Sequence, residues 1–206
     1  MNRMIVLLLG VVVAVSAEQK TAHVHLVPHN AETKNVTGEL TITQSADNTV
    51  EITGTVYGLT EGLHGFHVHE KADMREGCNS TGPHFNPTNA THGAPDSAVR
   101  HVGDLGNIRA NAQGEASVNI KDTVISLTGV NSILGRAIVV HSGEDDLGRG
   151  NTTLSATTGN AGGRWACVRG SESPTRSVGV GEGKRLFPRF LTLKGALRQP
   201  KMHFPT

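Results

Sequence analysis

Histidine is unusually common in this chain, with 11 among 206 residues, and most of the histidines lie in the middle of the sequence. His67 and His69 are separated by one residue, and residues at i and i+2 of a strand point to the same face. Two neighbouring imidazoles can bind a metal ion, and copper and zinc both accept imidazole nitrogen, zinc also carboxylate oxygen. The other candidate ligands are His84, His92, His101, Asp104 and His141. Their positions near the edges of expected strands and loops favour a metal site.

A second histidine pair with the same spacing occurs at residues 23–25. We expect Val24 and Leu26 to face the core, which places both histidines of this pair at the surface. No third ligand is nearby in the sequence, so we do not predict a metal site there. His29 and His203 are isolated in the sequence, and we expect both to be solvated.

Several short strands must position these side chains. Residues 40–43 and 50–53 alternate apolar and polar side chains, which is the period of a half-buried strand, and residues 45–48 between them favour a turn. Later short apolar runs are residues 116–120, 124–127 and 137–141. No window has a helical period. Many short strands with turn signals predict an all-β sandwich or barrel.

Two long polar segments interrupt the strands, at residues 70–103 and 142–163. Both are rich in Gly and Asn, and both directly follow a histidine. Structureless loops longer than about 15 residues are uncommon in compact domains unless they are functional or disordered. We therefore expect two long functional loops.

The first 17 residues have the pattern of a signal peptide. Arg3 precedes an apolar run at residues 4–15, and small residues at 15–17 favour cleavage before Glu18. A membrane anchor is the alternative, but the run is short and lacks a basic flank. We expect a secreted, extracellular protein. Its sequons for glycosylation begin at Asn35, Asn79, Asn89 and Asn151, and the sequence does not show which are used.

Charge divides the chain into two parts. Overall, 19 basic and 18 acidic residues nearly balance, which argues against nucleic acid as a partner. No apolar run reaches the roughly 20 residues needed to span a membrane. Residues 18–168 have a net charge of −6, whereas residues 169–206 have a net charge of +6. We therefore expect a domain at 18–168 and a basic tail of unknown structure at 169–206.

Four segments in order closely resemble the signature of copper/zinc superoxide dismutases. They are residues 58–70 (GLTEGLHGFHVHE), 82–87 (GPHFNP), 100–107 (RHVGDLGN) and 159–162 (GNAG). The resemblance spans roughly residues 21–168. It implies a Greek-key β-sandwich or barrel of about eight antiparallel strands. It also implies an enzyme that converts superoxide to dioxygen and hydrogen peroxide by alternate reduction and oxidation of copper.

The resemblance also assigns the metal ligands. The implied copper ligands are His67, His69, His84 and His141. The implied zinc ligands are His84, His92, His101 and Asp104. His84 would be shared as an imidazolate, because a neutral imidazole has only one free lone pair. Asp145 would link His67 to His92 and fix their ring orientation.

Further roles follow from the same resemblance. Arg164 would dock and orient the superoxide anion, and His84 would deliver a proton during turnover. Cys78 and Cys167, the only cysteines, would form an intrasubunit disulfide. His64 matches a histidine that packs against backbone, so we do not count it as a ligand.

Two departures from the family stand out. Thr153, Leu154 and Thr157 occupy places where the family usually has two acids and a lysine, so local steering by those charges is in doubt. After Val168 the resemblance ends. An alternative exon, an unspliced read-through and a lineage-specific extension all fit this tail.

The altered end bears on partners and on activity. The family's homodimer uses the end of its last strand, so we expect that dimer to be weakened here, and the basic tail could bind an extracellular polyanion. The alternative to an active enzyme is an inactive or weakly active relative that serves as a metal-binding or surface-binding sandwich.

Overall fold

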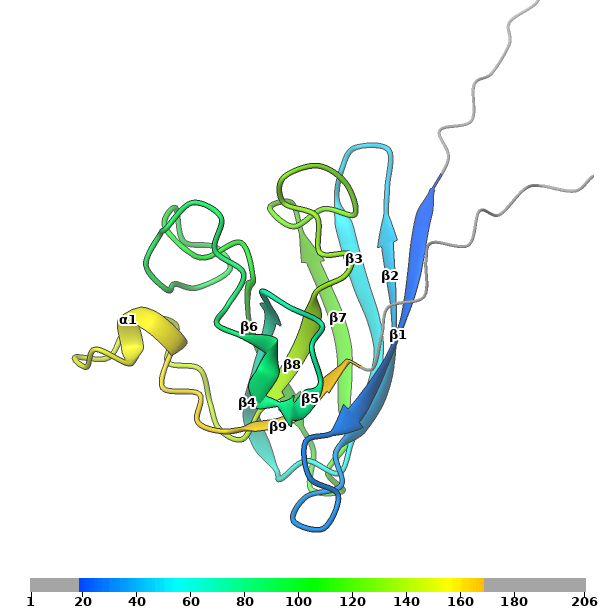
Figure 1. Ribbon diagram of the computed structural model, residues 1–206, viewed down its shortest axis with the longest axis vertical. Coiled ribbons are helices and arrows are strands. Elements are labelled where there is room, and N and C mark those ends of the chain that lie inside the picture. The colour runs from blue at the N-terminus through cyan, green and yellow to red at the C-terminus, as the bar shows by residue number, and fades with distance from the viewer. Residues whose placement is uncertain (1–18, 169–206) are drawn as a thin grey trace, which may run out of the picture. The chain divides into compact units, whose positions relative to one another are not determined.

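The computed structural model describes residues 19–168, and these residues form an all-β structure (Figure 1). Its strands are β1 (Lys20–Pro28), β2 (Thr37–Gln44), β3 (Val50–Tyr57), β4 (Gly62–His69), β5 (Arg75–Cys78), β6 (Asp104–Ala110), β7 (Ala116–Asp122), β8 (Ala137–His141) and β9 (Arg164–Val168). Two short helical turns accompany them, η1 (Asn79–Thr81) and α1 (Ser155–Thr158). A search of this described part finds no helix that is long and apolar enough to cross a membrane. The expected leader and basic tail lie outside the described residues.

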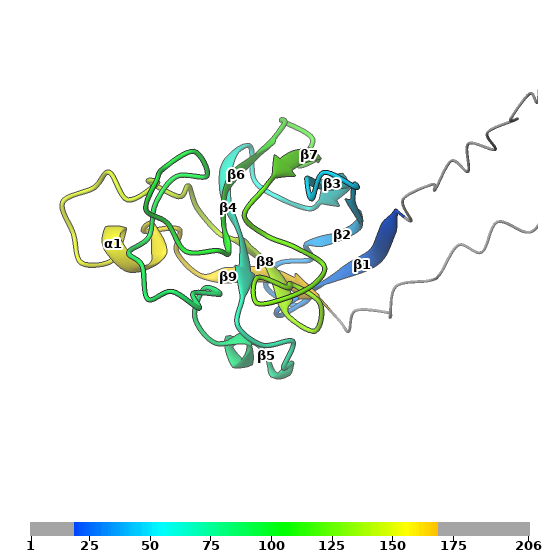
Figure 2. The same ribbon diagram turned by 90° about the horizontal axis from the view of Figure 1, so that it is seen from above.

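Eight of the strands form one antiparallel sheet in the order β6-β4-β8-β9-β1-β2-β3-β7. Its two edge strands, β6 and β7, are joined by a turn in which Asn111 N–H donates to Glu115 C=O at 2.9 Å. The edge strands also contact each other, so the sheet curls into a nearly closed barrel (Figure 2). The predicted all-β class with about eight antiparallel strands is confirmed.

Alternation along β1 and β2 gives the barrel an inner and an outer face. Val24 and Leu40 are register partners, and both are buried in the core. Burial of an aliphatic side chain of this size stabilises a fold by about 1.5–3 kcal/mol. His23 and His25 are exposed on the outer face, as predicted.

The expectation of a strand at residues 124–127 is wrong. The backbone N–H groups of Val124 and Ile125 both donate to Asp122 Oδ1, at 2.7 and 2.8 Å respectively. These two hydrogen bonds turn the chain out of the sheet directly after β7. The other oxygen of Asp122 accepts a hydrogen bond from Arg100 at 2.7 Å. The side chains of Ile125 and Leu127 are still buried in the core. An apolar run therefore indicated burial correctly here, but not the secondary structure.

The two long loops lie where the sequence predicts them, and a disulfide ties the first to the barrel. Cys78 ends β5 in the first loop and is bonded to Cys167 in β9, with Cα atoms 5.7 Å apart. Cys167 is in register with Val27 of β1 and Val139 of β8. The predicted pairing is confirmed, and it anchors the loop that leads to His84.

Candidate metal centre

Strand β4 brings His67 and His69 into the interior of the molecule. Phe66 and Val68 face the core, and both histidines lie on the other side of the strand, where they are also buried. β8 is the neighbour of β4 and ends at His141, so that His141 Nε2 lies 3.3 Å from His69 Nε2. A register shift between β8 and β9 at Val140 and His141 marks the point where this strand turns into the second loop.

The first loop places His84 beside this pair through backbone hydrogen bonds to the end of β4. Phe85 N–H donates to Val68 C=O at 2.8 Å, and Glu70 N–H donates to Pro83 C=O at 2.9 Å. The ring centroids of His67 and His84 are consequently only 4.1 Å apart. One ring nitrogen from each of four histidines lies within 4.8 Å of the others: His67, His69, His84 and His141.

A second cluster surrounds the carboxylate of Asp104, at the start of β6. Asp104 Oδ1 lies 2.8 Å from the Nδ1 atom of His84 and 3.0 Å from the Nδ1 atoms of His92 and of His101. Its other oxygen accepts hydrogen bonds from the backbone N–H groups of Gly93 and His101, which fixes the carboxylate in place. His84 thus belongs to both clusters.

Asp145 connects the two clusters. Its Oδ2 lies 2.8 Å from His67 Nε2, and its Oδ1 lies 2.7 Å from His92 Nε2. Gly159 has φ +64°, and a Cβ atom there would collide with this carboxylate, which explains a glycine at that position. The bridging role that the resemblance implied for Asp145 therefore fits the geometry.

Asn107 is a contributor that the sequence analysis missed. Its side-chain amide donates to Asp145 C=O at 2.8 Å and accepts from Asp145 N–H at 2.8 Å. This reciprocal pair holds the second loop against β6 at the residue that bridges the two clusters. Asn107 lies in the RHVGDLGN segment, but its residue type alone gave no sign of this contact.

The electrostatics of the two clusters differ. Burial lowers the pKa of His67 well below its ordinary value, and repulsion by His84 and His141 adds to the shift. Burial likewise lowers the pKa of His141, to about 3. Burial also disfavours protonated His92, but its hydrogen bonds with Asp104 and Asp145 outweigh this and raise its pKa to about 9. The first cluster therefore offers neutral imidazole nitrogens, whereas the second is organised around the carboxylate of Asp104.

The donor atoms fit metal ions. His67 Nδ1 and His84 Nε2 are buried and make no hydrogen bond with any described residue, although buried polar atoms normally find a partner. In the second cluster, donors about 2.0–2.2 Å from a tetrahedral ion would be separated by roughly 3.3 Å, close to the separations around Asp104 Oδ1. Three imidazoles with a carboxylate suit zinc, and an all-imidazole set suits copper.

Arg164 begins β9 at the mouth of the first cluster. Its Nη1 donates to Cys78 C=O at 2.8 Å, Asn79 C=O at 3.1 Å and Thr81 Oγ1 at 3.0 Å. It lines a cavity of about 480 Å³ that reaches the histidines. The cavity is lined by His69, Pro83, His84, His141, Leu154, Thr157, Thr158, Asn160, Gly162 and Arg164. Among the described residues of that lining, Arg164 is the only lysine, arginine or carboxylate, and it gives the channel a fixed positive charge.

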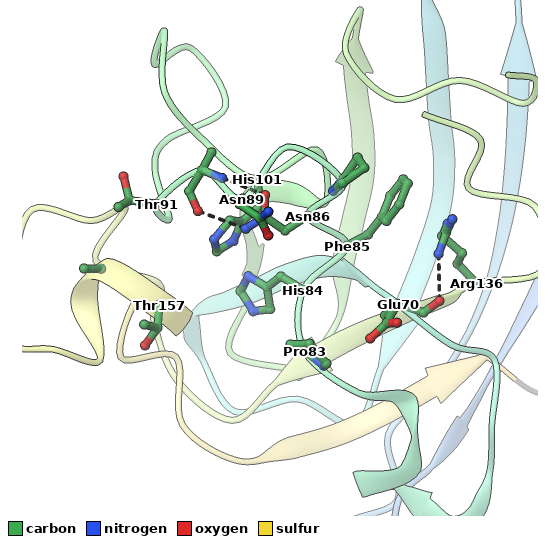
Figure 3. Close-up of a pocket in the computed structure, with 13 residues that line it drawn as sticks. Glu70, Pro83, His84, Phe85, Asn86, Asn89, Thr91, His101, Arg136 and Thr157 are labelled. Carbon is green, nitrogen blue, oxygen red and sulfur yellow. Dashed lines mark hydrogen bonds between the residues drawn. The ribbon is translucent and has the colours of Figure 1, made fainter. Parts of the chain in front are cut away.

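A second cavity, of about 670 Å³, is lined mainly by residues of the first loop. Figure 3 shows His84 and His101 among the residues around it. At its edge Arg136 donates from Nη1 to Glu70 C=O at 2.8 Å and lies over the ring of Phe85, 3.5 Å from its centroid. These contacts attach the loop before β8 to the backbone of Glu70 and to the ring of Phe85, the residue that follows His84. They help to hold the shared histidine in position.

Two further histidines, His64 and His29, lie in different environments. His64 is buried, with Nδ1 2.9 Å from His141 C=O and Nε2 2.9 Å from Thr60 C=O, which confirms packing against backbone. His29 is not simply solvated as expected. It is half-buried, and its Nδ1 accepts a hydrogen bond from Cys78 N–H at 3.0 Å. That contact joins residues far apart in sequence, so no local pattern could predict it.

Comparison with known protein families agrees with this geometry. The family model for copper/zinc superoxide dismutase (SODC) matches residues 36–169. The chain belongs to this family, and it is a superoxide dismutase, an oxidoreductase whose cofactors are copper and zinc.

Proposed function

We propose that this chain is a secreted copper/zinc superoxide dismutase with one copper and one zinc ion in each chain. The copper ligands in this proposal are His67, His69, His84 and His141. The zinc ligands are His84, His92, His101 and Asp104. The observation that carries the assignment is the environment of His84, whose Nδ1 lies 2.8 Å from Asp104 Oδ1 while its buried Nε2 has no hydrogen-bond partner.

When bound, copper supplies a one-electron redox couple, and zinc supplies a fixed positive charge beside His84 without redox chemistry. Arg164 docks the superoxide anion. Its three hydrogen bonds to described residues all leave from Nη1, so Nε and Nη2 have no partner among residues 19–168 and can donate to the anion. A planar guanidinium orients a small anion better than a point charge does.

Each turnover converts two superoxide anions and two protons to dioxygen and hydrogen peroxide. His84 takes up one proton at Nε2 and delivers it, because that nitrogen faces the first cluster while Nδ1 faces Asp104. Water supplies the other proton. Asp145 and Asn107 keep the rings of His67 and His92 in place throughout.

Secretion is supported by the N-terminal sequence. Arg3, the apolar run at residues 4–15 and the small residues at 15–17 together have the order of a cleavable signal peptide. The disulfide between Cys78 and Cys167 suits an oxidising extracellular compartment.

The partner proposals concern the tail. Family members typically form dimers, and in this chain Arg169, Glu172 and Pro174 follow the last strand. A buried charge without a partner costs several kcal/mol, and proline cannot donate to a strand ladder, so we expect a weakened homodimer. The tail's net charge of +6 could bind an extracellular polyanion, and the net charge of −6 on residues 18–168 is the alternative partner for it.

Metal analysis and superoxide turnover of the mature chain, with and without residues 169–206, test these proposals together. We expect one copper and one zinc per chain and consumption of superoxide in both forms. Light scattering and heparin retention of the same two proteins test the tail. Full metal content without turnover would favour the metal-binding sandwich, and a tight full-length dimer at nanomolar concentration would contradict the weakened interface.

A further inference from the structure

The outer face of β1 and β2 has a second group of metal-ligand side chains, apart from the metal centre. His23 and His25 lie one residue apart on β1, and Glu39 on β2 is the register partner of His25. Side chains at i and i+2 and at directly opposed positions share one face of a sheet. All three therefore project outward, while Val24 and Leu40 beside them face the core.

The side chains already approach one another. His25 Nδ1 lies 3.6 Å from Glu39 Oε1, and these side chains are 64% and 83% exposed. His23 Nδ1 lies 3.3 Å from Thr41 Oγ1, on the same face of β2. A shallow hollow of about 320 Å³ is bordered by these four residues. Among the described residues Glu39 forms no ion pair with lysine or arginine, so its charge is not neutralised by another side chain.

Strand geometry brings the three donors within reach of one ion. Positions i and i+2 are separated by about 6.6–6.8 Å along a strand, and directly opposed Cβ atoms by about 4.5–5.5 Å. Rotation of these exposed side chains disrupts no core packing. It can bring both imidazoles and the carboxylate to the roughly 2.0–2.2 Å that a borderline cation requires.

We propose that His23, His25 and Glu39 form a surface site for one borderline divalent cation, such as Cu²⁺, Ni²⁺ or Zn²⁺. Two imidazoles and one carboxylate match the ligand preference of these ions. The site is open to solvent and has one carboxylate, so the ion exchanges readily with the medium. Its binding does not depend on the metal centre, because no residue is shared between the two sites.

Equilibrium dialysis of the full-length, copper- and zinc-loaded protein against Ni²⁺ tests the site, since nickel can be counted separately from the resident metals. We expect one saturable Ni²⁺ per chain. Substitution His23→Gln or His25→Gln should weaken binding at least about tenfold, and Glu39→Gln by roughly threefold, amounts that correspond to loss of one ligand among three. His203→Gln, which removes one histidine elsewhere in the sequence, is the matched control and should leave binding unchanged.

Absence of saturable binding up to about 1 mM Ni²⁺ would overturn the proposal, because it would mean an affinity too weak for a three-ligand site. Unaltered affinity in the His23→Gln and His25→Gln variants would overturn it as well. Circular dichroism of these variants should match that of the parent protein, because the side chains are exposed. Failure of this site would leave the superoxide dismutase proposal intact, and loss of superoxide turnover would not remove the nickel site.

Discussion

The tripeptide His-Val-His occurs twice in this chain, at residues 23–25 in β1 and at residues 67–69 in β4. In both strands the valine faces the core. The histidines of β1 are exposed, whereas those of β4 are almost completely buried. The difference comes from outside the tripeptides, because two long loops add His84 and Asp145 beside β4, while the outer face of β1 stays open to solvent.

This comparison separates what a strand provides from what loops provide. A strand places two imidazoles on one face, but burial and further ligands decide how tightly a metal is held. Around His67, burial lowers the imidazole pKa, and Asp145 fixes the ring. Around His25, the nearest charged group is one exposed carboxylate at 3.6 Å, that of Glu39. The inner pair, His67 and His69, therefore serves a permanent metal centre. The outer pair, His23 and His25, serves an exchangeable metal site.

The largest effect is expected from His141→Ala, which removes a ligand from the inner pair's cluster. Loss of residues that merely orient ligands costs about 10–100-fold, so loss of a ligand itself should reduce superoxide turnover more than about 100-fold. Zinc should remain, because His141 is not in the second cluster, which consists of His84, His92, His101 and Asp104. Metal content and superoxide consumption measured on the same sample test this. Full activity in the variant would refute the copper assignment.

Reduction of the Cys78–Cys167 disulfide should give the next largest effect. The two cysteines are 89 residues apart, and the chain-entropy model predicts about 4–5 kcal/mol for a loop of that length. At roughly 2–4 °C per kcal/mol for a domain of this size, the melting temperature should fall by about 8–20 °C. Zinc retention should also weaken, since the bridge anchors the loop of His84 and His92. An unchanged melting curve, with reduction verified by thiol counting, would contradict a structural role.

Asp145→Asn tests the carboxylate link between His67 and His92, which has no counterpart at His23 and His25. An amide replaces one of the two oxygens that meet His67 Nε2 and His92 Nε2, so one of these rings loses its acceptor. Metal affinity should fall by about 10–100-fold, the usual cost of losing such a partner. Competition with a chelator measures it, with Asp47→Asn as the control because Asp47 is exposed and lies 20 residues before the nearest proposed ligand of the metal centre, His67. Equal affinities in the two variants would show that the link is not needed.

Much of this organisation could be predicted from the sequence. Alternation at residues 40–43 and 50–53 predicted β2 and β3, and the resemblance placed every member of both clusters. The exception was residues 124–127, where Asp122 accepts two backbone N–H groups and ends β7. Apolar character predicts burial, but a side chain that competes for backbone hydrogen bonds decides whether a strand continues.

Some contacts between residues distant in sequence could not be predicted, because no motif marks them. The reciprocal hydrogen bonds of Asn107 with Asp145, and that of His29 with Cys78, depend on how the loops return to the barrel. The proposed third ligand beside His23 and His25 also comes from a residue distant in sequence. Glu39 becomes the neighbour of His25 only through the register of β1 and β2.

Arg164→Ala should lower the second-order rate constant about tenfold at low ionic strength without removing either metal, because electrostatic attraction accelerates association by 10-fold or more. Within residues 19–168 the channel lining has no other lysine, arginine or carboxylate, so none of these neighbours compensates. Arg164→Lys should fall between the parent protein and Arg164→Ala, since it keeps the charge but loses the planar fork. Rates equal to those of the parent at low ionic strength would exclude a steering role.

The smallest effect is expected from the double substitution His23→Gln and His25→Gln. Superoxide turnover should stay within about twofold of the parent, since neither ring belongs to either cluster of the metal centre. Exposed substitutions usually change stability by no more than about 0.5 kcal/mol, so the melting temperature should move by less than roughly 2 °C. The matched double variant His67→Gln and His69→Gln should lose copper and turnover, although it changes the same two residue types at the same spacing. A comparable loss of turnover in both double variants would mean that the outer pair also serves the metal centre, and the distinction between permanent and exchangeable sites would then fail.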